Sequence, residues 1–124
     1  MSMIFIILTQ IFSDNIKSNN GEYDKLINQI YKLRSFRIDE DSLEKIKMES
    51  IVKGYKFKVY KFENVVETFK SATMDGRTTI EQSDPKDVEI YEFYKDGKIL
   101  FYVVKETYLG LNKRVYVNLY FLKD

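Results

Sequence analysis

Residues 88–106 read VEIYEFYKDGKILFYVVKE, and this stretch decides the fold class of the chain. Apolar, β-branched and aromatic residues fill both sides of Asp96-Gly97, as is typical of strands. The Asp-Gly pair suits a two-residue type I′ turn, because both central positions of that turn take positive φ. The stretch therefore predicts an antiparallel hairpin in which Val88–Lys95 pairs with Lys98–Glu106.

A two-residue loop fixes the expected register of this hairpin. It pairs Lys95 with Lys98, Phe93 with Leu100, and Tyr91 with Tyr102. One face then carries Ile90, Tyr94, Ile99, Phe101 and Val103, and the other carries Tyr91, Phe93, Leu100, Tyr102 and Val104. Neither face is polar, whereas a sheet with one solvated face shows clean alternation. We therefore expect something to cover each face, either this chain or a partner.

The remaining chain contains a helical pattern and several strand patterns. Apolar residues at the 3.6-residue spacing predict one helix from Glu22 to Leu33. Asp39–Ser50 fits either a short helix with Leu43 and Ile46 inward or the start of a strand through Ile46 and Met48, and we favour a short helix or turn followed by a strand. Period-two alternation predicts further strands over residues 55–60, 65–73, 77–82 and 114–122, with Asp75-Gly76 as a second hairpin turn.

These elements predict a single α+β domain over residues 1–124. Its expected architecture is one N-terminal helix packed on a curved antiparallel β-meander of about five to six strands, because consecutive hairpins favour neighbouring strands. This layout resembles the cystatin-like and NTF2-like folds, in element order only. The resemblance rests on no sequence motif and implies nothing about activity.

Residues 3–12, MIFIILTQIF, form the most apolar run of the chain. The run is too short to span a bilayer, which needs about 20 apolar residues. Two interpretations of residues 1–13 stay open: a signal-peptide-like segment, although no Lys or Arg precedes it, and a buried N-terminal strand or helix. A cytoplasmic location and a secreted or periplasmic one are equally compatible with this sequence.

The composition excludes several classes of chemistry. The chain has no Cys and no His, which rules out thiol catalysis, disulfides, His-based triads and His-bearing zinc sites. No phosphate-binding or nucleotide-binding glycine motif is present, so we expect no cofactor. Asp39-Glu40-Asp41 lacks the spacing of a calcium loop, and we interpret it as a solvated helix start with no metal.

The charges give no strong indication of a nucleic-acid partner. Twenty basic and 19 acidic residues leave a formal net charge of +1. A basic strand with interleaved aromatics, Lys53 to Phe62, has the composition of a single-strand binding surface. The same lysines also suit the outer face of an edge strand, which they protect from aggregation. We prefer the second interpretation and expect no nucleic acid.

Ten Tyr and nine Phe are the positive anomaly of the sequence. Aromatic residues are enriched at protein interfaces. The partner-binding residues that we predict are four tyrosines of the sheet and three residues of the YLGLN loop: Tyr91, Tyr102, Tyr116, Tyr120, Tyr108, Leu109 and Leu111. The competing interpretation is that the chain covers its own tyrosines, since Tyr tolerates half-burial.

The sequence thus favours a non-enzymatic protein that binds another macromolecule, of the inhibitor, immunity or anti-defence type. The partner is a protein or a second copy of the chain. One alternative is an extracytoplasmic domain that holds a small apolar ligand between helix and sheet. Another is a His-free enzyme that uses Glu92 with Tyr or Lys, because Glu92 shares a face with apolar residues.

Overall fold

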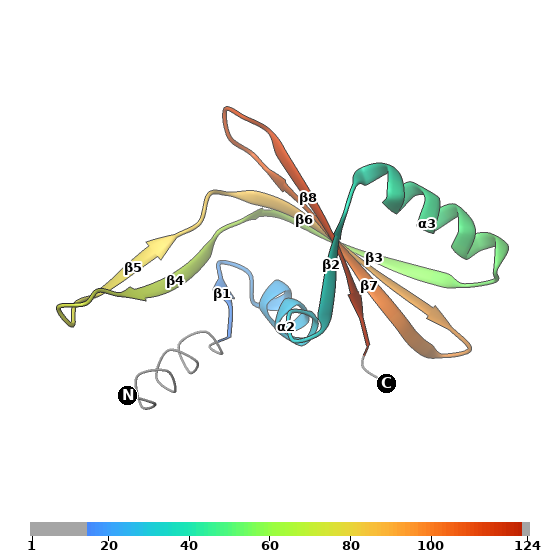
Figure 1. Cartoon of the computed structure of the whole chain (residues 1–124), viewed down its shortest axis with the longest axis horizontal. Coiled ribbons are helices and arrows are strands. Elements are labelled where there is room, and N and C mark those ends of the chain that lie inside the picture. Colours follow the sequence, from blue (N-terminus) through green and yellow to red (C-terminus); the bar gives the residue numbers. More distant parts are fainter. Residues whose placement is uncertain (1–14, 123–124) are drawn as a thin grey trace.

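A five-stranded antiparallel sheet forms the body of the protein in the computed structural model, which describes residues 15–122 (Figure 1). The expected segment of residues 1–13 lies outside the described residues. The strand order is β2-β8-β7-β6-β3. The bounds are Arg34–Ile38 for β2, Lys56–Val65 for β3, Lys86–Lys95 for β6, Lys98–Tyr108 for β7 and Arg114–Phe121 for β8.

A second, three-stranded sheet forms an arm that extends away from the body (Figure 1). Its order is β1-β4-β5, with β1 at Lys17–Ser18, β4 at Glu67–Ala72 and β5 at Thr78–Gln82. The arm continues the β3–β6 pair past a register shift between Phe62 and Val65, where Asn64 takes a φ of 51°. Such a bulge bends a strand and increases its twist, which turns the arm out of the plane of the body.

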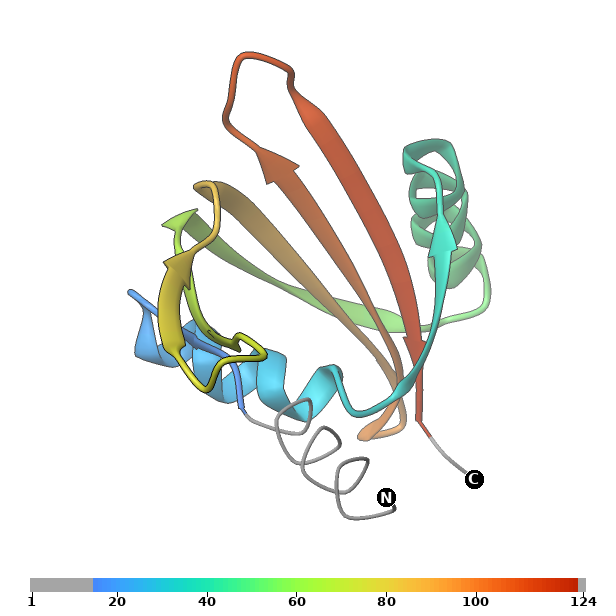
Figure 2. The ribbon, with the colours of Figure 1, turned by 60° about the vertical axis from the view of Figure 1, so that its left-hand side comes forward.

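Two helices lie on opposite faces of the five-stranded sheet (Figure 2). Helix α2 spans Gly21–Ile30 and is capped by the Asn20 side chain, which accepts from the backbone N–H of Glu22 and Tyr23, each at 3.1 Å. Its inner face buries Tyr23, Ile27 and Ile30. Capping of this kind satisfies backbone donors that would otherwise lack a partner.

The second helix, α3, spans Glu40–Val52 and corrects our expectation for this stretch. The strand that we predicted through Ile46 and Met48 is wrong. The Asp39 carboxylate caps the helix by accepting from the Ser42 N–H at 2.7 Å, and hydrogen bonding from Ser42 lowers the pKa of Asp39. The helix ends at Val52 with Lys53 as its C-cap, and Gly54 follows with a φ of 77°, which suits a glycine just past a helix end.

The fold class is therefore α+β, with two helices and eight strands in two antiparallel sheets among the described residues. The described residues thus form more helices and strands than the one helix and five to six strands that we expected. Strand β2 escaped prediction because its sequence, RSFRI, is short and mostly exposed and shows no clean apolar alternation. Helix α3 stands between β2 and β3, where we expected only a short helix or turn.

The central hairpin has the predicted turn and a different register beyond it. Lys95 pairs with Lys98 and Tyr94 with Ile99, and Asp96 and Gly97 take φ values of 54° and 78°. A bulge then places Phe93 opposite Phe101, and every pair beyond it differs from the expected one by one residue. Tyr91 therefore faces Val103, and Tyr102 faces Glu92.

This one-residue shift assigns the residues of β7 to faces opposite from those we expected. Tyr102 and Val104 join Ile90 in the core under α2, whereas Val103 and Phe101 join Tyr91 and Phe93 under α3. The α2 core contains Tyr23, Ile27, Ile30, Phe62, Val65, Val88, Ile90, Tyr102, Val104 and Tyr120. The α3 core contains Leu43, Tyr91, Phe93, Val103 and Val117. The chain thus covers both faces of its central strands with its own helices.

A row of phenylalanines crosses the sheet on the α3 face, one from each strand. In strand order they are Phe36, Phe121, Phe101, Phe93 and Phe57, and successive ring centroids lie 5.8, 6.5, 4.6 and 5.1 Å apart. Aromatic pairs at these separations add to the free energy gained by burial. The row is fully buried at Phe93 and opens to solvent at Phe36.

We predict that Phe93→Ala lowers the free energy of unfolding by about 3–5 kcal/mol, because it empties the centre of the row. The matched variant Phe36→Ala removes the same side chain from the exposed end and should lower it by about 1 kcal/mol. Urea unfolding followed by circular dichroism measures both. Equal losses for the two variants would contradict the packing described above.

Candidate functional site

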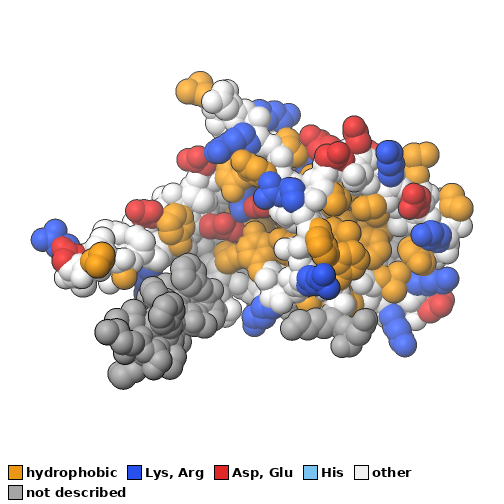
Figure 3. Space-filling view, in the orientation of Figure 1, with side chains coloured by type: hydrophobic (Ala, Val, Ile, Leu, Met, Phe, Trp, Pro, Cys, Tyr) orange, Lys and Arg blue, Asp and Glu red, His pale blue; other side chains and the backbone are white. Residues whose placement is uncertain are grey.

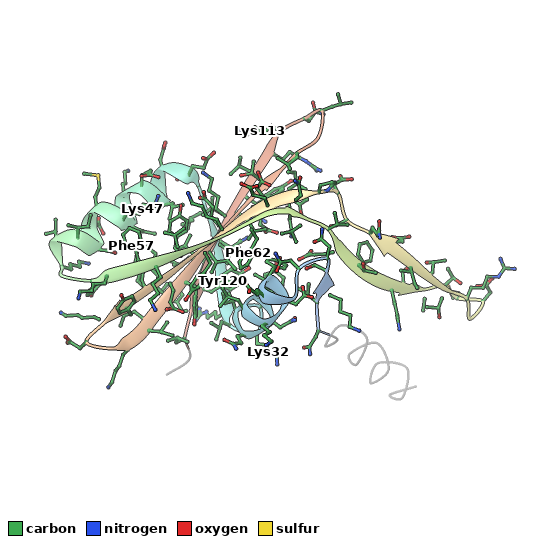
Figure 4. The ribbon with its side chains drawn as sticks, turned by 180° about the vertical axis from the view of Figure 1, so that it is seen from behind. Lys32, Lys47, Phe57, Phe62, Lys113 and Tyr120 are labelled. Carbon is green, nitrogen blue, oxygen red and sulfur yellow. The ribbon has the colours of Figure 1, made fainter. Side chains whose placement is uncertain are left out.

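Three of the four tyrosines predicted for the sheet surface are buried. Tyr91, Tyr102 and Tyr120 expose only 4%, 6% and 7% of their surface, so the folded chain does not present them as an exposed binding face. The cause is the pair of helices, since α3 covers Tyr91 and α2 covers the other two. Figure 4 shows Tyr120 and Phe62 lying beside α2.

Two of the buried tyrosines, Tyr91 and Tyr120, make contacts that suit a structural role. The Tyr91 hydroxyl donates to Glu89 at 2.7 Å, and the Lys47 ammonium lies 4.6 Å from the centre of its ring. The Tyr120 ring stacks on Tyr31 at 6.0 Å. Satisfying the polar end while burying the ring is how proteins accommodate Tyr in a core.

The other predicted residues meet at the tip of the β7–β8 hairpin. Leu109 and Leu111 are exposed there, and Leu111 is fully accessible to solvent. Tyr108 and Tyr116 stand at the base of the tip with ring centroids 5.8 Å apart, edge to face. The structure therefore brings together four of the seven residues that we predicted for partner binding.

Two arginines hold the tyrosines at this base. The Arg37 guanidinium lies 4.6 Å from the Tyr116 ring centre, and its Nε donates to Asn118 at 3.1 Å. The Arg114 guanidinium lies 5.3 Å from the Tyr108 ring centre. Planar guanidinium groups stack favourably on aromatic rings. The leucines thus project from a base in which two arginines pack against two tyrosine rings.

A buried ionic network lies where the arm joins the body, and our sequence analysis missed it. Lys86, 1% exposed, lies 3.2 Å from a Glu67 oxygen and also forms a salt bridge with Glu106. The Tyr23 hydroxyl donates to the second Glu67 oxygen at 2.6 Å. These residues come from β6, β4, β7 and α2, so no local spacing in the sequence indicates the network.

Each charged group of this network contacts a group of opposite charge. Burial alone would lower the pKa of the Lys86 ammonium, but the charge and hydrogen bond of Glu106 and the charge of Glu67 outweigh burial, and the pKa is raised. Within residues 15–122, no buried side-chain nitrogen or oxygen lacks a hydrogen-bond partner. The arrangement ties the arm, the sheet and α2 together, and we assign it a structural role.

The geometry gives little support to the two alternative sites, an active site at Glu92 and an apolar-ligand cavity between helix and sheet. Glu92 lies half-buried on β6, paired across the sheet with Lys58 and Tyr102. The space between α2 and the sheet is filled by the α2 core, and the groove beside it, about 230 Å³, lies at the outer edge of α2 and β3. A larger groove of about 400 Å³ lies within the arm, lined by residues of β1, β4 and β5.

Residues 15–122 contain no group of three acidic, His or Cys side chains placed to hold a metal ion. Neither described helix is long and apolar enough to cross a bilayer.

We predict that Lys86→Met destabilises the protein by about 3–5 kcal/mol, because it leaves two carboxylates buried without their counter-ion. The triple variant Lys86→Met, Glu67→Gln, Glu106→Leu removes the charges as well and should recover most of that loss. Urea unfolding midpoints measure both. A single variant as stable as the native protein would show that the network is not important for stability.

We also predict that stability falls as the pH rises above about 10, the usual pKa of Tyr. Burial and the charge of Glu106 raise the pKa of Tyr120 to about 12, and burial, Tyr31 and Glu67 raise the pKa of Tyr23. Both phenols stay neutral in the folded state but ionise in the unfolded state, so their contribution is complete below pH 10 and is lost above it.

Phenolate absorbance measured together with circular dichroism tests this pH dependence. Some tyrosines should ionise only as the fold is lost, in one steep late phase. Ionisation of all ten tyrosines near pH 10 with the fold intact would contradict the prediction.

Comparison of the whole chain with protein-family models, with curated proteins and with solved structures finds no match. No relative therefore assigns a role to the tip or to the ionic network, and the cystatin-like and NTF2-like likeness gains no support. What this chain does has to be argued from its own geometry.

Proposed function

We propose that this chain is a non-enzymatic protein that binds a partner macromolecule through the tip of its β7–β8 hairpin. The observation that carries the proposal is the pair of exposed leucines, Leu109 and Leu111, on a protruding hairpin with a packed aromatic base. Exposed apolar side chains at a loop tip are typical of interaction sites. We assign the protein to the inhibitor, immunity or anti-defence type.

The rigid base favours binding because fewer degrees of freedom are lost when a partner docks. Residues that are already fixed before association lose less conformational entropy on binding. The stacked pairs Arg37–Tyr116 and Arg114–Tyr108 fix the roots of both strands, and the Leu109 N–H donates to the Pro85 carbonyl at 3.1 Å. The tip therefore presents its leucines in a defined position.

Two basic residues border the exposed leucines at the tip, as charged residues border the apolar centre of many protein interfaces. Lys113 and Arg114 are exposed beside the leucines, and Figure 4 shows Lys113 at the end of the hairpin. An apolar centre with a charged rim is the usual anatomy of a protein–protein interface. With Tyr91, Tyr102 and Tyr120 in the core, the proposed surface reduces to Tyr108, Leu109, Leu111 and Tyr116.

We predict that a photo-crosslinking amino acid at position 111 forms one discrete protein adduct in cells of the native host. The same amino acid at position 74 is the matched control, since Met74 is an equally exposed apolar residue at the tip of the arm. The adduct should form from position 111 and be absent from position 74.

The double variant Leu109→Ser, Leu111→Ser should weaken capture of that protein by roughly tenfold or more, as loss of apolar anchors does. Met74→Ser should leave capture unchanged. Adducts of equal yield from both positions, or capture that is insensitive to the leucine changes, would overturn the proposal.

A further inference from the structure

The end of the sheet farthest from the hairpin tip is rich in lysine. Residues 48–58 and 92–98 meet there, because the start of β3 pairs with the end of β6. Five lysines in these segments are exposed, and within the described chain none of them forms a salt bridge: Lys53, Lys56, Lys58, Lys95 and Lys98. The acidic residues of the same segments are Glu49, Glu92 and Asp96.

The charge of this end differs from that of the remaining chain. Five lysines against three acidic residues leave an excess of two positive charges in these segments. The whole chain has a formal net charge of +1, so the remainder has a net charge of −1. A protein with balanced overall charge thus has a positive excess at this end, and such an end attracts a negative surface.

Exposed apolar side chains lie in the last two turns of α3, directly before Lys53. Met48, Ile51 and Val52 expose 69%, 69% and 87% of their surface, although the helix packs its other side on the sheet through Leu43. Their spacing of three and four residues places them on one outer face of the helix, which ends at Lys53. Figure 3 shows basic and apolar side chains intermixed at this end of the molecule.

We propose that this lysine-rich end docks on an anionic lipid surface, with Met48, Ile51 and Val52 entering the headgroup region. Apolar side chains beside several basic residues are the combination that holds peripheral proteins on anionic membranes. The charges are complementary, and most of the surface of the three apolar side chains is left in solvent by the folded chain.

The kind of cation favours a lipid surface over an acidic protein. All five basic residues are Lys and none is Arg. Protein interfaces are enriched in Arg and depleted in Lys, because the guanidinium makes paired hydrogen bonds to carboxylates. A bilayer presents diffuse negative charge, for which the point charge of Lys is sufficient.

The aromatic residues disfavour single-stranded nucleic acid. Tyr55 is half-buried, and the Lys95 ammonium lies 5.5 Å from its ring centre, so its face is not open to a base. Binding of single strands depends on free aromatic faces for stacking. This inference is independent of the proposed function, because the hairpin tip lies at the opposite end of β7 from the β6–β7 turn (Figure 1).

Sedimentation with vesicles tests the proposal on the full chain. We expect binding to vesicles of phosphatidylcholine with phosphatidylserine and none to phosphatidylcholine alone. Neutralising Lys53 and Lys95 as Lys53→Gln, Lys95→Gln should weaken binding on the order of 30-fold. The matched control Lys25→Gln, Lys32→Gln changes two exposed lysines near α2 and should leave binding unchanged.

A fluorescent reporter tests the apolar contact. The chain has no Trp, so Ile51→Trp introduces a single indole, whose emission should shift to shorter wavelength on the anionic vesicles. Met74→Trp, at the tip of the arm, should show no shift. Equal binding to both kinds of vesicle, equal loss in the two lysine pairs, or binding to a single-stranded oligonucleotide in place of vesicles would overturn the inference.

Discussion

The architecture depends on one constraint, that the two central strands are apolar on both faces. Strands β6 and β7 contribute buried residues to the α2 core and to the α3 core alike. Leaving either face in water would expose large apolar area, so each face needs its own cover. The chain meets this need by passing from α2 along the edge strand β2 to α3 on the other face.

This two-sided burial also decides which residues are available for function. Three of the tyrosines predicted for a binding surface, Tyr91, Tyr102 and Tyr120, are packed under the helices, and the Tyr91 hydroxyl donates to Glu89. Exposed apolar side chains remain at the extremities, on the hairpin tip, on the outer face of α3 and on the arm. We therefore place function at the ends of the sheet, away from its faces.

The ionic network shows how the arm is held against the body. Lys86 is the first residue of β6 and Glu67 the first residue of β4, so their contact spans the junction between the two sheets. A buried ion pair adds little stability over an apolar pair, but its geometry is demanding. Its contribution here is to fix where the arm leaves the sheet and where Tyr23 of α2 sits.

The sequence by itself determined the local features of this protein. Asp96-Gly97 determined the central turn and the first pairs beside it, and the apolar character of both hairpin faces required a cover on each side. The tertiary structure decided the rest. The bulge beside Phe93 moved Tyr91 and Tyr102 to opposite faces, and contacts among four separate elements formed the Lys86 network. A turn is set by the φ preferences of two residues, whereas a bulge and a buried ion pair depend on neighbours that only folding brings together.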